Sequence, residues 1–210
     1  MDLLTRMNRV AFLGPEFLSW LWYRTETKGP EFSVSGIEGA IEIWFDDRLI
    51  VGSTLVNAQE NHFKGGHPTT SLEARSALRL GKLATEARIR IVHGSREWSF
   101  VLKGADLSLN GVKIPSVLSK DDEERLYERL YLLEELDRMV FGIFGQFLKL
   151  RGSEDWVQNE LPAIRRWVGG HESESSMAPQ AIGSVDPAIR KETPRNESIP
   201  PWEDPMGEPS

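Results

Sequence analysis

The chain has 210 residues, 40% of them hydrophobic and 27% charged, so it can bury the core of one domain, with or without an appendage. Its net charge is -7 and it has no cysteine, which excludes disulfides, a thiolate nucleophile and a cysteine-based metal site. The beginning of the chain lacks the apolar run of a secretory signal and no stretch is apolar enough to span a bilayer, so we expect a soluble, cytoplasmic protein.

The first elements predicted are a helix and a hairpin. Gly14-Pro15 favours a helix start, because the first turn needs no donor from proline, and the aromatic-rich FLSWLWY that follows is typical of a core or a packed interface. The run IEIWF then alternates like a strand. We expect Asp46-Asp47 to turn the chain, so that RLIV returns as the second strand of a hairpin.

A second helix is predicted over 70–81, after a loop that contains Lys64. Thr70 and Glu73 have the spacing of a capping box, and Gly81 is placed to end the helix. The segment LATEARIRIV then alternates strictly, which predicts a strand with isoleucines on one face and arginines on the other.

The remaining pattern predicts more strands and two helices. REWSFVLK reads as a strand after a turn at 93–95, and Asn110-Gly111 predicts a tight hairpin. Acidic residues after Ser119 favour a helix start, and an apolar stripe then runs to Arg151. The stripe comprises Leu126, Leu130, Leu133, Leu136, Val140, Phe144 and Phe147. With a short last helix near Trp167, the predicted class is α+β: an antiparallel sheet with helices packed against it.

The chain is expected to divide into a domain over 1–170 and a tail over 171–210. The tail holds seven of the 12 prolines, with three basic and eight acidic residues. Such a composition predicts disorder, because little apolar surface offsets the entropy of ordering. The stretch around Ile199 and Trp202 could be a docking peptide for a partner. The acidic tail could instead compete with DNA for the basic residues of the domain, or it could be inert.

Positive charge gathers in the middle of this acidic chain. Residues 64–103 hold eight basic and three acidic residues, a net charge of +5. Arg75, Arg79 and Lys82 share one side of the predicted helix, and Arg88 and Arg90 share one face of the next strand. One interpretation is a continuous surface that binds phosphates; the other is a solvated face paired with acids.

Enzyme signatures are missing from the sequence. Glu60, His62 and His67 lie close together, but their spacing matches no common zinc pattern. There is no nucleophile elbow, phosphate-binding loop or dinucleotide fingerprint. We therefore expect no enzyme activity, no metal and no cofactor.

The run EARSALRLGKLATEARIRIVHGSREWSFVLKGADLSLNGVKIP resembles the C-terminal half of RdgC, the bacterial recombination-associated protein. The opening FLGPEFLSWLWYRTE, IEIWFDDRLIV and LYLLEELDRMVFGIFGQFLKLR also look like RdgC-like proteins, so the resemblance covers most of residues 11–168. The N-terminal half of RdgC has no counterpart, and Gly65 and Gly66 stand where a relative can carry lysines.

The resemblance implies a nucleoid-associated protein that binds DNA without sequence preference and restrains RecA-promoted strand exchange, in that family as a ring-shaped dimer. It implies DNA contacts by Lys64, Arg75, Arg79, Lys82, Arg88 and Arg90, and either a homodimer or a partner that supplies the missing half. The alternative is a protein-interaction module that has kept the fold but lost DNA binding, with an apolar patch on the helix from Phe17 to Tyr23.

Overall fold

The computed structural model describes residues 13–52 and 60–170. The tail predicted for 171–210 lies outside the described residues. The strands, in chain order, are β1 (Glu31–Phe32), β2 (Ile41–Gly52), β3 (Asn61–Lys64), β4 (Leu83–His93), β5 (Arg96–Lys103) and β6 (Leu109–Lys113). The helical elements are α2 (Leu13–Lys28), η1 (Pro68–Thr70), α3 (Leu72–Arg79), α4 (Asp122–Arg151), η2 (Trp156–Glu160) and α5 (Leu161–Gly169).

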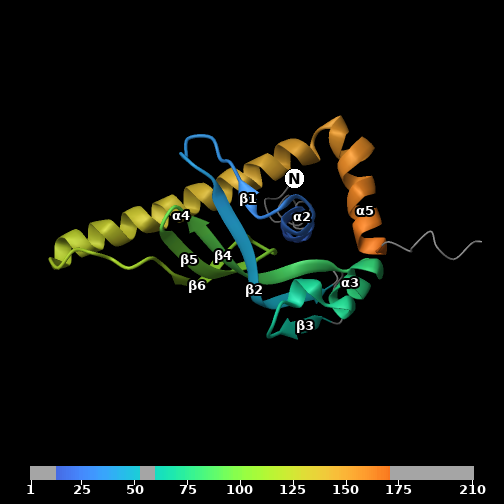
Figure 1. Ribbon diagram of the computed structural model, residues 1–210, viewed down its shortest axis with the longest axis horizontal. Helices are drawn as coiled ribbons and strands as arrows, with labels where there is room; N and C mark the ends of the chain where they lie inside the picture. Colours follow the sequence, from blue (N-terminus) through green and yellow to red (C-terminus); the bar gives the residue numbers. More distant parts are fainter. Residues whose placement is uncertain (1–12, 53–59, 171–210) are drawn as a thin grey trace, which may run out of the picture. The chain divides into compact units, whose positions relative to one another are not determined.

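The described strands form one six-stranded antiparallel sheet in the order β1-β2-β4-β5-β6, with β3 also paired to β2 (Figure 1). β4 buries Ala87, Ile89 and Ile91 on the face that β5 completes with Trp98 and Phe100. Helices α2 and α4 bring their apolar side chains into the same core. The predicted α+β class, with helices packed against an antiparallel sheet, is confirmed.

Helix α2 is buried, not a docking surface. Every side chain from Phe17 to Tyr23 is buried, and Phe17 packs edge-on against Phe144 of α4 with ring centroids 5.1 Å apart. Buried aromatic surface of this kind stabilises a core. The apolar patch expected on this helix is therefore absent from the described surface.

Neither predicted hairpin turn forms where we expected it. β2 runs straight through Asp46-Asp47, because both of its halves pair with the long strand β4: Phe45 lies opposite Ile89 and Leu49 opposite Ala87. The acidic pair is accommodated as a bulge, which adds residues to one strand without reversing it.

The predicted hairpin at Asn110-Gly111 is also a bulge. β6 passes through both residues, and Gly111 has a φ of 61°, a conformation that glycine adopts readily. The register between β5 and β6 shifts there. The chain turns earlier, where the Lys103 amide donates to the carbonyl of Ser108 at 3.0 Å.

The outer edge of β2 is shared by two short strands. The Ile43 amide donates to the carbonyl of Pro30 at 2.9 Å, and proline has no N–H to return the bond. At the other end the Gly65 amide donates to the carbonyl of Asp47 at 2.8 Å. Neither β1 nor β3 was predicted from the sequence.

Helix α3 is capped by Ser71 rather than Thr70. The Ser71 Oγ accepts from the Ala74 amide at 3.3 Å, so the helix begins later than predicted. The prediction for Gly81 is confirmed: it has a φ of 80°, and its amide donates to Leu78 while that of Lys82 donates to Ala77. These two bonds form a Schellman motif, which joins α3 to β4 with almost no linker.

Helix α4 begins after the cap Asp121, not Ser119, and its predicted apolar stripe is only half buried. Leu136, Val140 and Phe147 are buried, but Leu126, Leu130 and Leu133 are 41% to 55% exposed. The first part of the helix extends past the sheet (Figure 1). Across the described ranges, no helix has the length and apolar character needed to traverse a bilayer.

Candidate nucleic-acid interface

The six predicted DNA-contacting residues do not form one surface. Arg75, Arg88 and Arg90 line a groove over the sheet, whereas Arg79 and Lys82 line a separate hollow beside α5. Lys64 lies at the end of β3, opposite Arg48, and lines neither. The groove and the hollow differ in the charge of their lining residues.

The sheet groove, of about 770 Å³, lies across β2, β4, β5 and β6. Four of its lining residues are cross-strand neighbours, so that they form one row over the sheet: Trp44, Arg90, Ser99 and Lys113. An exposed aromatic ring beside two cations is a pattern that single-stranded nucleic acids can use.

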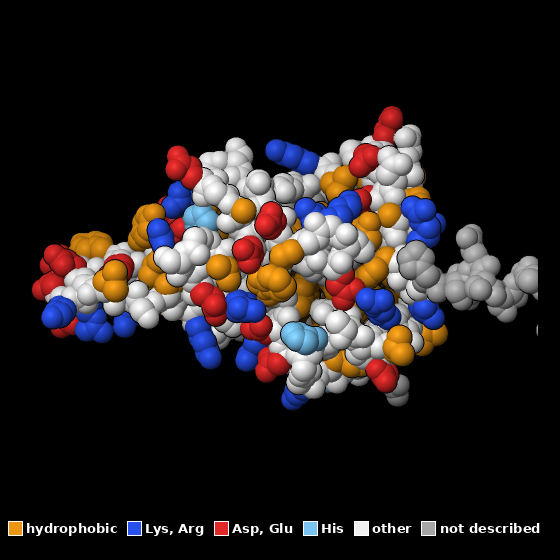
Figure 2. Space-filling view, viewed as in Figure 1, with side chains coloured by type: hydrophobic (Ala, Val, Ile, Leu, Met, Phe, Trp, Pro, Cys, Tyr) orange, Lys and Arg blue, Asp and Glu red, His pale blue; other side chains and the backbone are white. Residues whose placement is uncertain are grey.

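The cations of the sheet groove are matched by acids. Its lining contains four basic residues, which are Arg75, Arg88, Arg90 and Lys113, and four acidic ones, which are Glu26, Asp46, Asp47 and Glu97. Arg88 lies 3.6 Å from Asp47, and Arg90 lies 3.5 Å from Asp46. Figure 2 shows acidic and basic side chains interspersed over this face. The groove therefore fits the interpretation of a solvated, acid-paired face.

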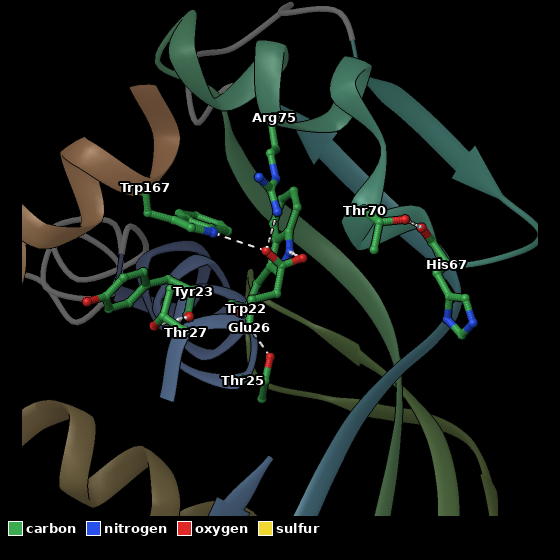
Figure 3. Close-up of polar contacts among 9 residues, drawn as sticks. All are labelled: Trp22, Tyr23, Thr25, Glu26, Thr27, His67, Thr70, Arg75 and Trp167. Atoms are coloured by element: carbon green, nitrogen blue, oxygen red, sulfur yellow. Dashed lines mark hydrogen bonds and ion pairs between the residues drawn. The ribbon is translucent and has the colours of Figure 1, made fainter. Parts of the chain in front are cut away.

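Arg75 is held at the end of this groove by Glu26. Its Nη2 lies 2.7 Å from Glu26 Oε2, and the same carboxylate accepts from Trp22 Nε1 at 2.9 Å and from Trp167 Nε1 at 3.0 Å. Figure 3 shows the two indoles and the guanidinium converging on this carboxylate, with Thr25 below and His67 across the groove. Arg75 thus connects α2, α3 and α5.

The second place is the α3–α5 hollow, of about 420 Å³, between the end of α3, the start of β4 and α5. Leu78, Leu83, Ile164, Trp167 and Val168 give it an apolar floor, and Ser19 of α2 also lines it. The charged residues in its lining are Arg79, Lys82 and Arg165. No acid is among the described residues that line it, so the described lining of this hollow is positively charged.

Arg79 caps the C-terminus of α5. Its Nε donates to the Val168 carbonyl at 2.8 Å, and its Nη2 donates to the Gly169 carbonyl. Gly170, with a φ of 71°, follows at once, and a Cβ there would lie 2.5 Å from Arg79 Nη2. The acceptors of Arg79 are backbone carbonyls at the negative end of a helix dipole, a place where a cation is stabilised.

The other two cations come from opposite sides of the hollow. Lys82 follows the Schellman turn of α3, and its Nζ donates to the neutral Asn61 Oδ1 at 2.6 Å. Arg165 is exposed on α5. Figure 2 shows basic side chains over α3 and α5 at this end of the fold.

Arg165 was not predicted from the sequence, because it lies far along the chain from the basic residues of 64–103. Only the packing of α5 beside α3 brings it to Arg79. Trp44 and Lys113 were missed for the same reason, since the row they form depends on strand register.

The histidines considered as metal ligands lie apart. His62 Nε2 is 3.5 Å from Glu60 Oε2, while His67 lines the sheet groove. In the part of the chain that the structure describes, no three His, Asp or Glu side chains are grouped to hold a metal ion.

Comparison with known proteins adds no relative: no protein-family model matches the chain, and no curated protein matches it.

Proposed function

We propose that the chain binds DNA without sequence preference, and that the cations of the α3–α5 hollow contact its phosphates. The observation that carries this proposal is the charge of the hollow: Arg79, Lys82 and Arg165 line it and no acid among the described residues does. Phosphate binding gains from the counterions that such cations release, whatever the base sequence.

The proposal narrows the set of contacts predicted from the sequence. Arg79 and Lys82 remain, Arg165 joins them, and Arg75 is assigned to the structural contact with Glu26. Arg88 and Arg90 are assigned a smaller part, because phosphates would have to displace Asp46 and Asp47. The resemblance to RdgC extends the proposal to DNA recombination, and a homodimer stays a prediction.

The test compares two variants with equal charge loss. Lys82→Gln/Arg165→Gln removes two cations from the hollow, and Arg88→Gln/Arg90→Gln removes two from the sheet groove. Anisotropy of a labelled single strand and a labelled duplex is followed from about 50 to about 200 mM salt. We expect the hollow variant alone to bind more weakly, with a salt slope smaller by roughly 1.4 on the single strand.

Equal loss in both variants would mean that the binding surface is not the hollow. No binding by the unaltered chain at low salt would dispose of the DNA proposal altogether.

A second candidate function, a protein-interaction module, is favoured by α4. Leu126, Leu130 and Leu133 are exposed on its first half. Exposed apolar side chains that lie together are typical of a surface that contacts another protein. Contact through these residues would persist at high salt, unlike phosphate binding. Light scattering of the unaltered chain and of Leu126→Ser/Leu130→Ser at high salt tests for self-association there. If both proteins have the mass of a monomer at all concentrations, a second copy of the chain is not the partner.

A further inference from the structure

The α3–α5 hollow has a floor that phosphate contacts do not explain. Below the cations, Leu78 of α3, Leu83 of β4 and Ile164 of α5 present apolar side chains, and Trp167 adds an indole. A site for phosphate alone needs a charged or polar surface, not a recessed apolar one. A ligand that fills it must carry negative charge and a flat or apolar group together.

Contacts on three sides hold the hollow in shape. Arg79 binds the last carbonyls of α5, and the Schellman motif fixes Lys82 next to the end of α3. On the third side, the Trp167 indole donates to Glu26 and packs edge-on against Trp22, with ring centroids 5.2 Å apart. A preformed site of this kind loses little conformational entropy when it binds.

Duplex and single-stranded DNA differ in what they can place there. In a duplex the bases are paired and stacked, so that only phosphates and sugars reach the cations and the floor stays empty. In a single strand an unstacked base can enter an apolar pocket while its flanking phosphates stay outside. The volume of about 420 Å³ is within the range of small-molecule binding pockets.

We infer that the α3–α5 hollow takes an unpaired nucleobase, with Arg79, Lys82 and Arg165 on the flanking phosphates, and that the protein prefers single-stranded over duplex DNA. This inference rests on the proposed function and deepens it, because it names the form of DNA that the site selects.

The experiment uses the unaltered full chain and three probes of about twelve nucleotides: a thymidine single strand, an abasic strand with the same phosphates, and a duplex. We expect the thymidine strand to bind at least about fivefold more tightly than the abasic strand, since burying one base accounts for such a difference. The duplex should bind more weakly than the thymidine strand. Equal affinity for all three overturns the inference and leaves the phosphate proposal standing, whereas no binding to any of them overturns both.

Two variants locate the effect. Ile164→Ser makes the floor polar without changing charge, and we expect the preference for the thymidine strand to vanish while the salt slope stays. Lys82→Gln/Arg165→Gln should weaken binding to every probe and keep the preference. If Ile164→Ser keeps the full preference, the base does not enter this hollow. The comparison of the three probes on the unaltered chain decides the inference even if this variant fails to fold.

Discussion

The guanidinium of Arg75 and the carboxylate of Glu26 form an ion pair, with Nη2 and Oε2 2.7 Å apart, that fastens α3 to the end of α2. The same carboxylate accepts hydrogen bonds from the indoles of Trp22 and Trp167. Arg75, which the sequence predicts as a DNA contact, therefore stabilises the packing of α3 against α2. Substitution of Arg75 should therefore change the free energy of unfolding more than the affinity for DNA.

Arg75→Gln should lower the free energy of unfolding by about 1–3 kcal/mol, because it leaves a mostly buried carboxylate without its charged partner. Arg88→Gln is the matched control: its ion pair with Asp47 is exposed and 3.6 Å long, so the loss should stay below about 1 kcal/mol. Urea denaturation of both variants measures the difference. Equal stabilities would show that the Glu26 contact holds nothing together.

Two glycines one turn apart in α4 should respond oppositely to alanine. A Cβ on Gly142 would lie 2.2 Å from Val34 Cγ1, whereas one on Gly145 would meet nothing within 4 Å. Gly145→Ala should raise the free energy of unfolding by about 0.5–1 kcal/mol, since alanine favours a helix. Gly142→Ala should lower it by about 1–3 kcal/mol through overpacking. Thermal and urea unfolding measure both, and a gain in both would contradict the close contact between α4 and Val34.

The start of α3 should contribute a pH-dependent stability. The Ser71 hydroxyl donates to Glu73 Oε2 at 2.5 Å, and this bond lowers the pKa of the Glu73 carboxyl from 4.5. A carboxyl whose pKa falls on folding stabilises the fold above its unfolded pKa, and this contribution is lost as the pH falls through the lowered value. Glu73→Gln should thus destabilise the protein at neutral pH and have no effect once the carboxyl is protonated.

Urea denaturation at neutral pH and near pH 3 tests this, in the unaltered chain and in Ser71→Ala. In the Ser71→Ala background the donor is gone, so the effect of Glu73→Gln should depend far less on pH. A pH dependence that survives there would assign the effect to another partner.

The exposed leucines of α4 should be nearly neutral for folding. Leu130→Ala should change the free energy of unfolding by no more than about 0.5 kcal/mol, because its side chain is already in solvent. Leu136→Ala, on the same helix but buried, should cost about 2–5 kcal/mol. A large cost at Leu130, measured by urea at low protein concentration, would mean that another surface covers it.

The strands that were predicted correctly are those with a local signal. β4 and β5 alternate residue by residue, and their buried residues are the isoleucines and aromatics that the alternation indicated. The turn predicted at 93–95 forms between β4 and β5. The turn predicted at Asp46-Asp47 does not form, because β4 is long enough to pair with both halves of β2. No local pattern around Asp46 contains that information.

Spacing predicted α4 as a helix but not which of its faces is buried. Leu126, Leu130 and Leu133 recur at the same intervals as the buried Leu132, Leu136 and Met139, so the pattern holds two apolar faces. The candidate site had the same limit. Arg75 is spaced like Arg79, and only the fold sets it against Glu26, 49 residues away.

Both margins of the sheet have features that disfavour the addition of a strand from another chain. On one side the edge strands β1 and β3 are short. On the other side β6 is short, bulged at Gly111, and carries Lys113. Short, bulged and charged margins of this kind disfavour edge-to-edge aggregation of the sheet.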